Sequence, residues 1–301
     1  MGLPGIITIV GTNASGKSAV GVELAKRFGG EIISADSRQI FRGFDLCCGK
    51  ITAEETQAIP HHLINIKDIG EPFSVSDFQK MAYSLIPQIR SRGKTPFIVG
   101  GTGLYVSSVV SGYVLGDEPD DTTLRDALEE LPVDELQAML TPEGKAYIAA
   151  NPSDSRNRRR LIRIIEKSSR GAPLGYENEA RYDALQLGIT WPKEILHKRI
   201  EERLERRLEL GMIDEVRSYL AGGGDPGHLY GLGLEYRCIL RYLSGGFESR
   251  EDFNLELSRE IKRFAKRQMT WFRRDKSIHW LDMEADHIAQ ASSLISGFLG
   301  R

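Results

Sequence analysis

The 301-residue sequence predicts an α/β fold, in which helices flank a parallel sheet and a helical insertion interrupts the chain. Short apolar segments alternate with amphipathic ones in the first part of the chain, and glycine-rich turns follow two of the apolar segments. The alternation stops near residue 112 and resumes near residue 182. We therefore expect a core formed by residues 1–112 and 182–301, and an insertion domain formed by residues 113–181.

The first glycine-rich turn carries the strongest motif. After the apolar segment 6–10 the chain reads Gly11-Thr12-Asn13-Ala14-Ser15-Gly16-Lys17-Ser18, and an amphipathic segment follows over 19–28. This is the strand, loop and helix context of a P-loop, whose glycines let successive N–H groups point at phosphate oxygens. Lys17 would bind the terminal phosphate oxygens and Ser18 a Mg²⁺ ion. A P-loop NTPase-like sheet that binds a di- or triphosphate is predicted, with a ligand-free glycine turn as the alternative.

Two more apolar segments end in turns that could carry chemistry. Segment 31–35 ends in Asp36, at the edge where open α/β sheets place their ligands. Its position leaves two roles open, a catalytic group or an N-cap of the next segment. Segment 96–99 runs into Gly100-Gly101-Thr102-Gly103, where the glycines allow a ligand or a loop to approach the backbone closely. A plain tight turn is the alternative there.

Helical spacing marks several segments of the core. Ser74, with Asp77 three residues later, predicts the start of a helix over 73–92. A strand over 187–191 precedes a helix from Pro192, with the proline in its first turn. On that helix three arginines recur at spacings of four and three, and the residues alone favour ion pairs with neighbouring glutamates over binding of a polyphosphate. The arginines are Arg199, Arg203 and Arg206, and the glutamates are Glu201, Glu202 and Glu205.

The formal net charge of −2 conceals basic stretches. Residues 151–170 carry seven Arg and Lys against two acids, and residues 259–276 carry eight against two. Local density of positive charge suggests a surface that binds a polyanion, since phosphate contacts depend on nearby Lys and Arg and not on the overall charge. Solvated helix faces are the alternative for each stretch.

Cysteine usage and hydropathy limit the class of protein. The three cysteines, Cys47, Cys48 and Cys238, can form neither a disulfide framework nor a four-ligand zinc site. No apolar run approaches the about 18 residues that a membrane span needs. We therefore expect a cytoplasmic protein that does not associate with membranes.

Five motifs taken together, in this order, resemble those of the tRNA dimethylallyltransferases over nearly the whole chain. They are the P-loop, Asp36-Ser37-Arg38-Gln39, Pro60-His61-His62-Leu63, Gly100-Gly101-Thr102-Gly103-Leu104-Tyr105, and Ala265-Lys266-Arg267-Gln268-Met269-Thr270-Trp271-Phe272-Arg273. The resemblance implies transfer of a dimethylallyl group from dimethylallyl diphosphate to N6 of adenosine 37, in tRNAs that read codons starting with U. It implies Mg²⁺ as cofactor and the anticodon stem-loop of tRNA as partner, and we expect a monomer.

The same resemblance implies roles for individual residues. Asp36, Thr102 and Arg203 would be catalytic, with Asp36 accepting a hydrogen bond from the attacking amine. The P-loop residues Gly11, Thr12, Asn13, Ala14, Ser15, Gly16, Lys17 and Ser18 would bind the diphosphate, and Ser18 would also bind the metal. Contacts with tRNA are implied for Asp36, Ser37, Arg38, Gln39, Thr102, Arg125, Arg159, Arg160, Leu161, Ile162 and Arg163.

Two other functions are compatible with the P-loop. A P-loop kinase of a nucleotide or small metabolite would share the loop, the Mg²⁺ and the arginines. An RNA-binding protein that uses a nucleotide only as a switch is less favoured, because nothing resembles a switch loop or a base-recognition loop.

Overall fold

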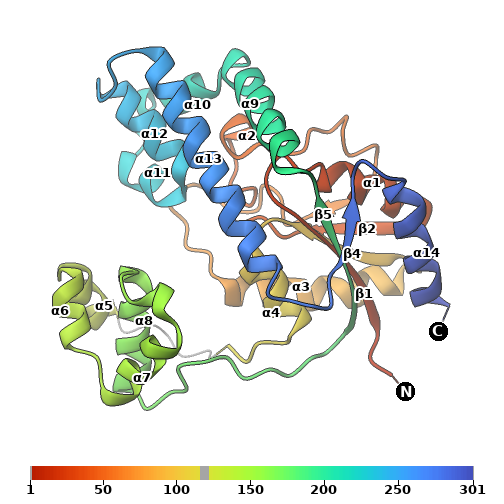
Figure 1. Ribbon diagram of the computed structural model, residues 1–301, viewed down its shortest axis with the longest axis horizontal. Helices are drawn as coiled ribbons and strands as arrows, with labels where there is room; N and C mark the ends of the chain where they lie inside the picture. Colours follow the sequence, from red (N-terminus) through yellow and green to blue (C-terminus); the bar gives the residue numbers. More distant parts are fainter. Residues whose placement is uncertain (1, 116–121, 301) are drawn as a thin grey trace. The chain divides into compact units, whose positions relative to one another are not determined.

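The computed structural model describes residues 2–115 and 122–300, and its core is a parallel sheet with strand order β3-β2-β4-β1-β5-β6 (Figure 1). The strands are β1 (Gly5–Val10), β2 (Gly30–Ser34), β3 (His61–His62), β4 (Thr95–Gly100), β5 (Asp183–Thr190) and β6 (His279–Asp282). Every neighbouring pair runs parallel. The predicted α/β class with a parallel sheet is confirmed.

The sheet belongs to a compact unit formed by Met1–Gly112 and Ala180–Arg301. Its helices are α1 (Lys17–Arg27), α2 (Asp45–Cys48), α3 (Val75–Ser91), α4 (Gly103–Val110), α9 (Lys193–Glu209), α10 (Met212–Ala221), α11 (Pro226–Leu232), α12 (Leu234–Leu243), α13 (Arg250–Phe272) and α14 (His287–Leu299). Within the described ranges, none of the helices is long and apolar enough to cross a bilayer.

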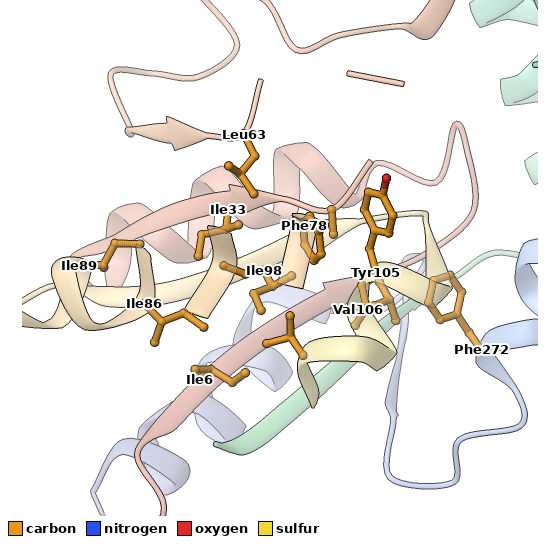
Figure 2. Packing of buried hydrophobic residues seen from close by; sticks show 14 of the residues in the cluster. Ile6, Ile33, Leu63, Phe78, Ile86, Ile89, Ile98, Tyr105, Val106 and Phe272 are labelled. Atoms are coloured by element: carbon orange, nitrogen blue, oxygen red, sulfur yellow. The ribbon is translucent and has the colours of Figure 1, made fainter. Parts of the chain in front are cut away.

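Both faces of the sheet are buried, because the side chains of β1, β2, β4, β5 and β6 alternate between two apolar clusters. In β1, Ile6 and Val10 pack with α3 and α4, whereas Ile7 and Ile9 pack with α1 and α14. Figure 2 shows the first cluster, in which Ile6 of the sheet lies among side chains of the covering helices. This two-sided burial accounts for the nearly continuous apolar runs that marked the strands in the sequence.

Local signals placed some element ends correctly. Ser74 caps α3, since its Oγ accepts the N–H of Asp77 (3.2 Å) while the Asp77 carboxylate accepts the N–H of Ser74 (2.7 Å). Strand β5 starts four residues before the predicted strand, because Asp183–Gln186 pair with β1 although two of the four residues are polar. Pro192 is the N-cap of α9 and not a residue of its first turn.

A third apolar cluster holds α2 and the helices α9 to α13 together. Its largest buried side chains include Tyr236 of α12 and Phe253 of α13. Phe44, just before α2, packs edge-on against Tyr236 with ring centroids 5.4 Å apart. These helices are therefore anchored to the loop that leaves β2, which matters for the site described below.

The second compact unit is Tyr113–Glu179. It contains α5 (Thr122–Glu129), α6 (Val133–Ala138), α7 (Pro142–Ala150), a 3₁₀ turn (Pro152–Asp154) and α8 (Arg158–Ser169). Leu128, Leu136 and Leu161 form its core with their neighbours. The unit begins where the insertion was predicted to begin, at residue 113, and it ends two residues before the predicted end at residue 181. Residues 116–121 of the predicted insertion lie outside the described residues.

Candidate active site

The P-loop connects β1 to α1, and the helix begins at Lys17, two residues before the predicted start. Gly16 precedes it with φ +91°, and no side chain caps the helix. The first N–H groups of α1 therefore remain available to an anion. Ala14 has φ +58°, which is uncommon for a residue with a Cβ and indicates that its surroundings hold the loop in this shape.

Three side chains from distant parts of the chain hold the P-loop. Gln268 Oε1 accepts the N–H of Asn13 (2.9 Å), while Arg199 and Trp191 donate to the carbonyls of the next two residues (3.0 and 2.8 Å). Gln268 Nε2 also donates to the carbonyl of Gly101 (2.9 Å), which joins the two glycine-rich turns. The loop is thus preorganised by α13, α9 and the residue after β5. The P-loop motif in the sequence does not predict these three supporting side chains.

Several polar atoms inside the P-loop lack partners. Thr12 Oγ1, Asn13 Oδ1 and Ser15 Oγ are buried and make no hydrogen bond within the described part of the chain. A buried polar atom left unpaired is costly, so such atoms are rare in folded proteins. Their concentration in one loop favours a bound polar ligand over the alternative of a ligand-free turn.

Lys17 and Ser18 lie in one cavity with Asp36, at the carboxyl ends of β2 and β4. Lys17 Nζ donates to the carbonyl of Thr12 (3.2 Å). Burial lowers the pKa of the Lys17 ammonium from 10.5 to about 8; the Asp36 carboxylate opposes this shift. The hydroxyl of Ser18 and the carboxylate of Asp36 are oxygen donors of the kind that Mg²⁺ prefers, so the residues present fit the expected ion.

Asp36 closes a turn and does not cap a helix. Its Oδ1 accepts the N–H of Arg38 (3.0 Å), and the next helix begins only at Asp45. Asp36 therefore caps the turn over 37–40, as the capping alternative expected, although no helix begins there. Oδ2 accepts no hydrogen bond within the described residues, and it remains available to a ligand in the cavity.

The second glycine-rich turn brings three parts of the chain together. Thr102 Oγ1 accepts the N–H of Ser37 (3.0 Å), so it supports the residue next to Asp36. A Cβ at Gly100 would collide with the carbonyl of Ala35, and a Cβ at Gly103 would collide with the Trp271 ring. The expected close approach to this backbone is confirmed, and it is made by other parts of the same chain.

Arg199 and Arg203 of α9 contact main-chain carbonyls. Arg203 donates to the carbonyl of Gly49 (2.9 Å), and Arg199 holds the P-loop as described. The favoured pairing of these arginines with neighbouring glutamates is wrong, since Glu201 pairs with Lys262 and Glu202 with Lys198. For Arg206 no ion pair occurs within the part of the chain that the structure describes.

Two of the side chains expected at the RNA have partners inside the protein. Arg38 forms an ion pair with Glu235, whose side chain is 2% exposed. Gln39 accepts the hydroxyl of Ser34 (3.4 Å) and donates to Gly49 (3.5 Å). Both side chains thus have partners within the folded chain.

The arginines expected to contact RNA in the second unit are also largely paired. Arg125 Nε and Nη2 donate to the two oxygens of Glu166 (2.8 and 2.7 Å), whose side chain is 1% exposed. Arg163 also contacts Glu166, at 3.5 Å, and Arg160 pairs with Asp154. These contacts stabilise the unit itself.

The remaining residues of the run 159–163 differ in how far their side chains are exposed to solvent. Leu161 and Ile162 are buried in the core of the unit, so the expected contact with RNA does not extend to their side chains as folded here. Arg159 is exposed and forms no ion pair among the residues that the structure describes. Of the run from 159 to 163, Arg159 is thus the side chain that is most available to a polyanion.

Comparisons with known proteins identify the chain's relatives. The family model described as IPP transferase matches residues 39–275. A tRNA dimethylallyltransferase 1 from Geotalea daltonii is 42% identical, with 97% of this chain and 95% of that protein covered. A tRNA dimethylallyltransferase 2 from Citrifermentans bemidjiense is 40% identical, with 98% and 96% covered.

Solved structures agree with these relatives. The full-length tRNA isopentenylpyrophosphate transferase from Bacillus halodurans superposes with a TM-score of 0.73 at 37% identity, covering 97% of this chain and 95% of that one. A eukaryotic dimethylallyltransferase acting on tRNA superposes with a TM-score of 0.79 at 23% identity, covering 99% and 80%, which supports the fold. The match of the family model and the full-length relatives show that this chain belongs to the IPP transferase family, which includes the tRNA dimethylallyltransferases.

Proposed function

We propose that this chain transfers a dimethylallyl group from dimethylallyl diphosphate to N6 of adenosine 37, in tRNAs that read codons starting with U. The observation that carries the proposal is the shared cavity of Lys17, Ser18 and Asp36. A cation that follows β1 and a carboxylate that follows β2 line this cavity, and one oxygen of the carboxylate has no partner within the described residues. That arrangement suits a reaction in which a diphosphate leaves while an amine attacks.

The P-loop would bind the diphosphate of the donor. The N–H groups at the start of α1 and the Lys17 ammonium would stabilise the negative charge that builds up as the carbon–oxygen bond breaks. Ser18 would hold a Mg²⁺ ion, which when bound adds positive charge to the leaving group. Arg203, anchored at Gly49, lies close enough to Lys17 to influence its pKa and adds to the positive field.

Asp36 would act on the acceptor base. The N6 lone pair of adenine is delocalised into the ring, so the amine is a weak nucleophile. Oδ2 of Asp36 can accept one of its protons, which orients the amine and offsets the positive charge that develops as the carbon–nitrogen bond forms. Thr102 contributes by holding Ser37, the neighbour of Asp36, through the hydrogen bond described above.

The RNA partner would be bound by local positive charge. Lys266 and Arg267 on α13 and Arg159 on α8 are exposed, although the net charge of the chain is −2. Phosphate contacts of this kind fix the register of the nucleic acid and leave the base to be read by the site. We expect the chain to act as a monomer, and the elution volume of the active species in size-exclusion chromatography checks this.

One incubation separates this function from a kinase. Purified protein is mixed with unmodified tRNA and Mg²⁺, and either labelled dimethylallyl diphosphate or labelled ATP is added. Transfer of the dimethylallyl label to tRNA supports the proposal. Label transferred only from ATP would instead indicate a kinase.

Asp36→Asn tests the role of the carboxylate. The side chain keeps its shape and can still accept the N–H of Arg38, but it loses its charge. With both substrates saturating, single-turnover transfer should fall by roughly 10² to 10⁴, while each substrate binds within a few-fold of the wild type. A rate close to that of the wild type would remove Asp36 from the reaction.

A further inference from the structure

Arg38 stands two residues after Asp36 and is the most enclosed basic side chain of this turn. Its side chain is 14% exposed and forms an ion pair with Glu235, near the start of α12. The guanidinium also lies over the ring of Phe264 on α13, 5.5 Å from the ring centroid. Two helices therefore hold this arginine from different sides.

The partner of Arg38 is even more deeply buried. Glu235 is 2% exposed, so its charge depends on Arg38 for compensation. Moving Arg38 out to a phosphate would leave a buried carboxylate without its cation. Contact between the Arg38 side chain and RNA is therefore disfavoured, although the position of Arg38 in the Asp36–Gln39 motif suggests such a contact.

The backbone of Arg38 connects the Arg38–Glu235 ion pair to the carboxylate of Asp36, the proposed catalytic group. Its N–H donates to Asp36 Oδ1 (3.0 Å), which orients the carboxylate, and Oδ2 has no partner within the described residues. The neighbouring Ser37 N–H is fixed by Thr102 (3.0 Å). A shift of Arg38 would thus move the carboxylate directly.

We propose that Arg38 and Glu235 form a positioning pair, which holds the Asp36 carboxylate in its reactive orientation through the backbone of Arg38 and makes no contact with RNA. This inference rests on the proposed function. Neither residue touches the reacting atoms, and both act through Asp36.

The chain offers a matched control on the same segment. Arg42 pairs with Asp68 (2.9 Å), but these side chains are 52% and 70% exposed. An exposed pair contributes little to stability or position. Asp68→Asn therefore removes one charge from a neighbouring pair without disturbing a buried anchor.

The experiment compares Arg38→Gln, Glu235→Gln, the double variant and Asp68→Asn. Single-turnover transfer to tRNA, with both substrates saturating, should fall about 10- to 100-fold in each of the first two variants, since a small misplacement of a reacting group has effects of this size. The double variant should be no slower than the slower single variant, because the two residues act as one unit. Asp68→Asn should keep the wild-type rate.

Binding and exchange measurements separate positioning from RNA contact. The tRNA affinity and its salt dependence should stay unchanged in Arg38→Gln and Glu235→Gln. Amide hydrogen exchange over residues 36–41 should be faster in both variants and unchanged in Asp68→Asn. Weaker tRNA binding with a smaller salt dependence in Arg38→Gln alone would show that Arg38 contacts RNA, and would overturn the inference.

The failure of the inference can be told apart from failure of the proposed function. If the wild type transfers no dimethylallyl group to tRNA, the proposed function fails, and with it the catalytic part of the inference. If the wild type is active and Glu235→Gln matches it in rate, only the positioning role fails. Unchanged hydrogen exchange in Glu235→Gln would reject the anchor whatever the activity.

Discussion

The P-loop and helix α8 both concentrate polar groups, but they differ in what those groups bind. Three buried polar atoms of the P-loop have no partner within the described residues, whereas Arg160 and Arg163 near the start of α8 pair with carboxylates of their own unit. An unpaired buried atom costs stability, and folding alone does not account for it. A paired arginine is explained by folding. Three unsatisfied atoms clustered in one loop therefore indicate a ligand site more strongly than a high density of charge does.

The two regions also differ in how they are supported. Side chains from α9 and α13 and from the end of β5 hold the P-loop, so its shape depends on residues far away in the sequence. Arg160 and Arg163 of α8 are held by Asp154 and Glu166, within a few residues of them. Substitutions should accordingly affect chemistry in the first region and stability in the second.

Lys17→Ala should have the largest effect on chemistry. It removes the cation that stabilises the leaving diphosphate, so transfer should fall by at least about 10²-fold. The tRNA affinity should stay nearly unchanged, because the cation serves the donor. Single-turnover transfer and tRNA binding by filter retention measure the two quantities. Equal losses in both would contradict this division between donor and RNA sites.

Arg125→Met should act on stability and not on the chemical step. It leaves the carboxylate of Glu166, 1% exposed, with only the 3.5 Å contact to Arg163 as compensation within residues 2–115 and 122–300. Loss of one partner of a buried pair costs about 3 kcal/mol. Amide hydrogen exchange of peptides from α8 should report this loss as a lower free energy of opening.

Arg159→Met is the control for this comparison. Its side chain is exposed, and the change should alter the opening free energy by less than about 0.5 kcal/mol. If Arg125→Met left the exchange of α8 unchanged but weakened tRNA binding, Arg125 would be an RNA contact in spite of its pairing.

The pH dependence of the donor site provides a third test. Because burial lowers the pKa of Lys17 to about 8, the free enzyme loses this charge as the pH rises through that value. The kcat/KM for dimethylallyl diphosphate should therefore fall up to about tenfold per pH unit above pH 8. The kcat should change less, since the bound diphosphate raises the pKa of the ammonium. A kcat/KM that stays flat to pH 10 would show that the charge of Lys17 is not needed for capture of the donor.

Local patterns predicted the backbone of the site well. The P-loop motif and the Ser74–Asp77 capping box each depend on residues within a few positions, and both elements formed as expected. The two-residue strand β3 was not predicted, because two residues carry no periodic signal. The first four residues of β5 were not predicted, because two of them are polar and interrupt the apolar pattern, although all four pair with β1.

Side-chain partners at long range could not be predicted in the same way. The contact of Gln268 with Asn13 spans 255 positions, and that of Arg38 with Glu235 spans 197. No local pattern encodes such a pair, since it depends on how α12 and α13 pack against the loops of the sheet. For this reason the sequence alone could not predict that Arg38 pairs with a buried glutamate.

The smallest expected effect is also the finest test of the comparison between paired and unpaired groups. Arg159 and Arg160 are neighbours on α8 and both are exposed, but only Arg160 has a carboxylate partner, Asp154. If availability decides binding, Arg159→Gln should lower the slope of log affinity for tRNA against log salt by roughly one, a few-fold in affinity at low salt. Arg160→Gln should change the slope much less, because its charge is already neutralised. Titrations of tRNA at several salt concentrations with both variants measure this difference. Equal decreases would mean that Arg160 leaves Asp154 when RNA binds, and that pairing within the free protein does not predict which arginines contact RNA.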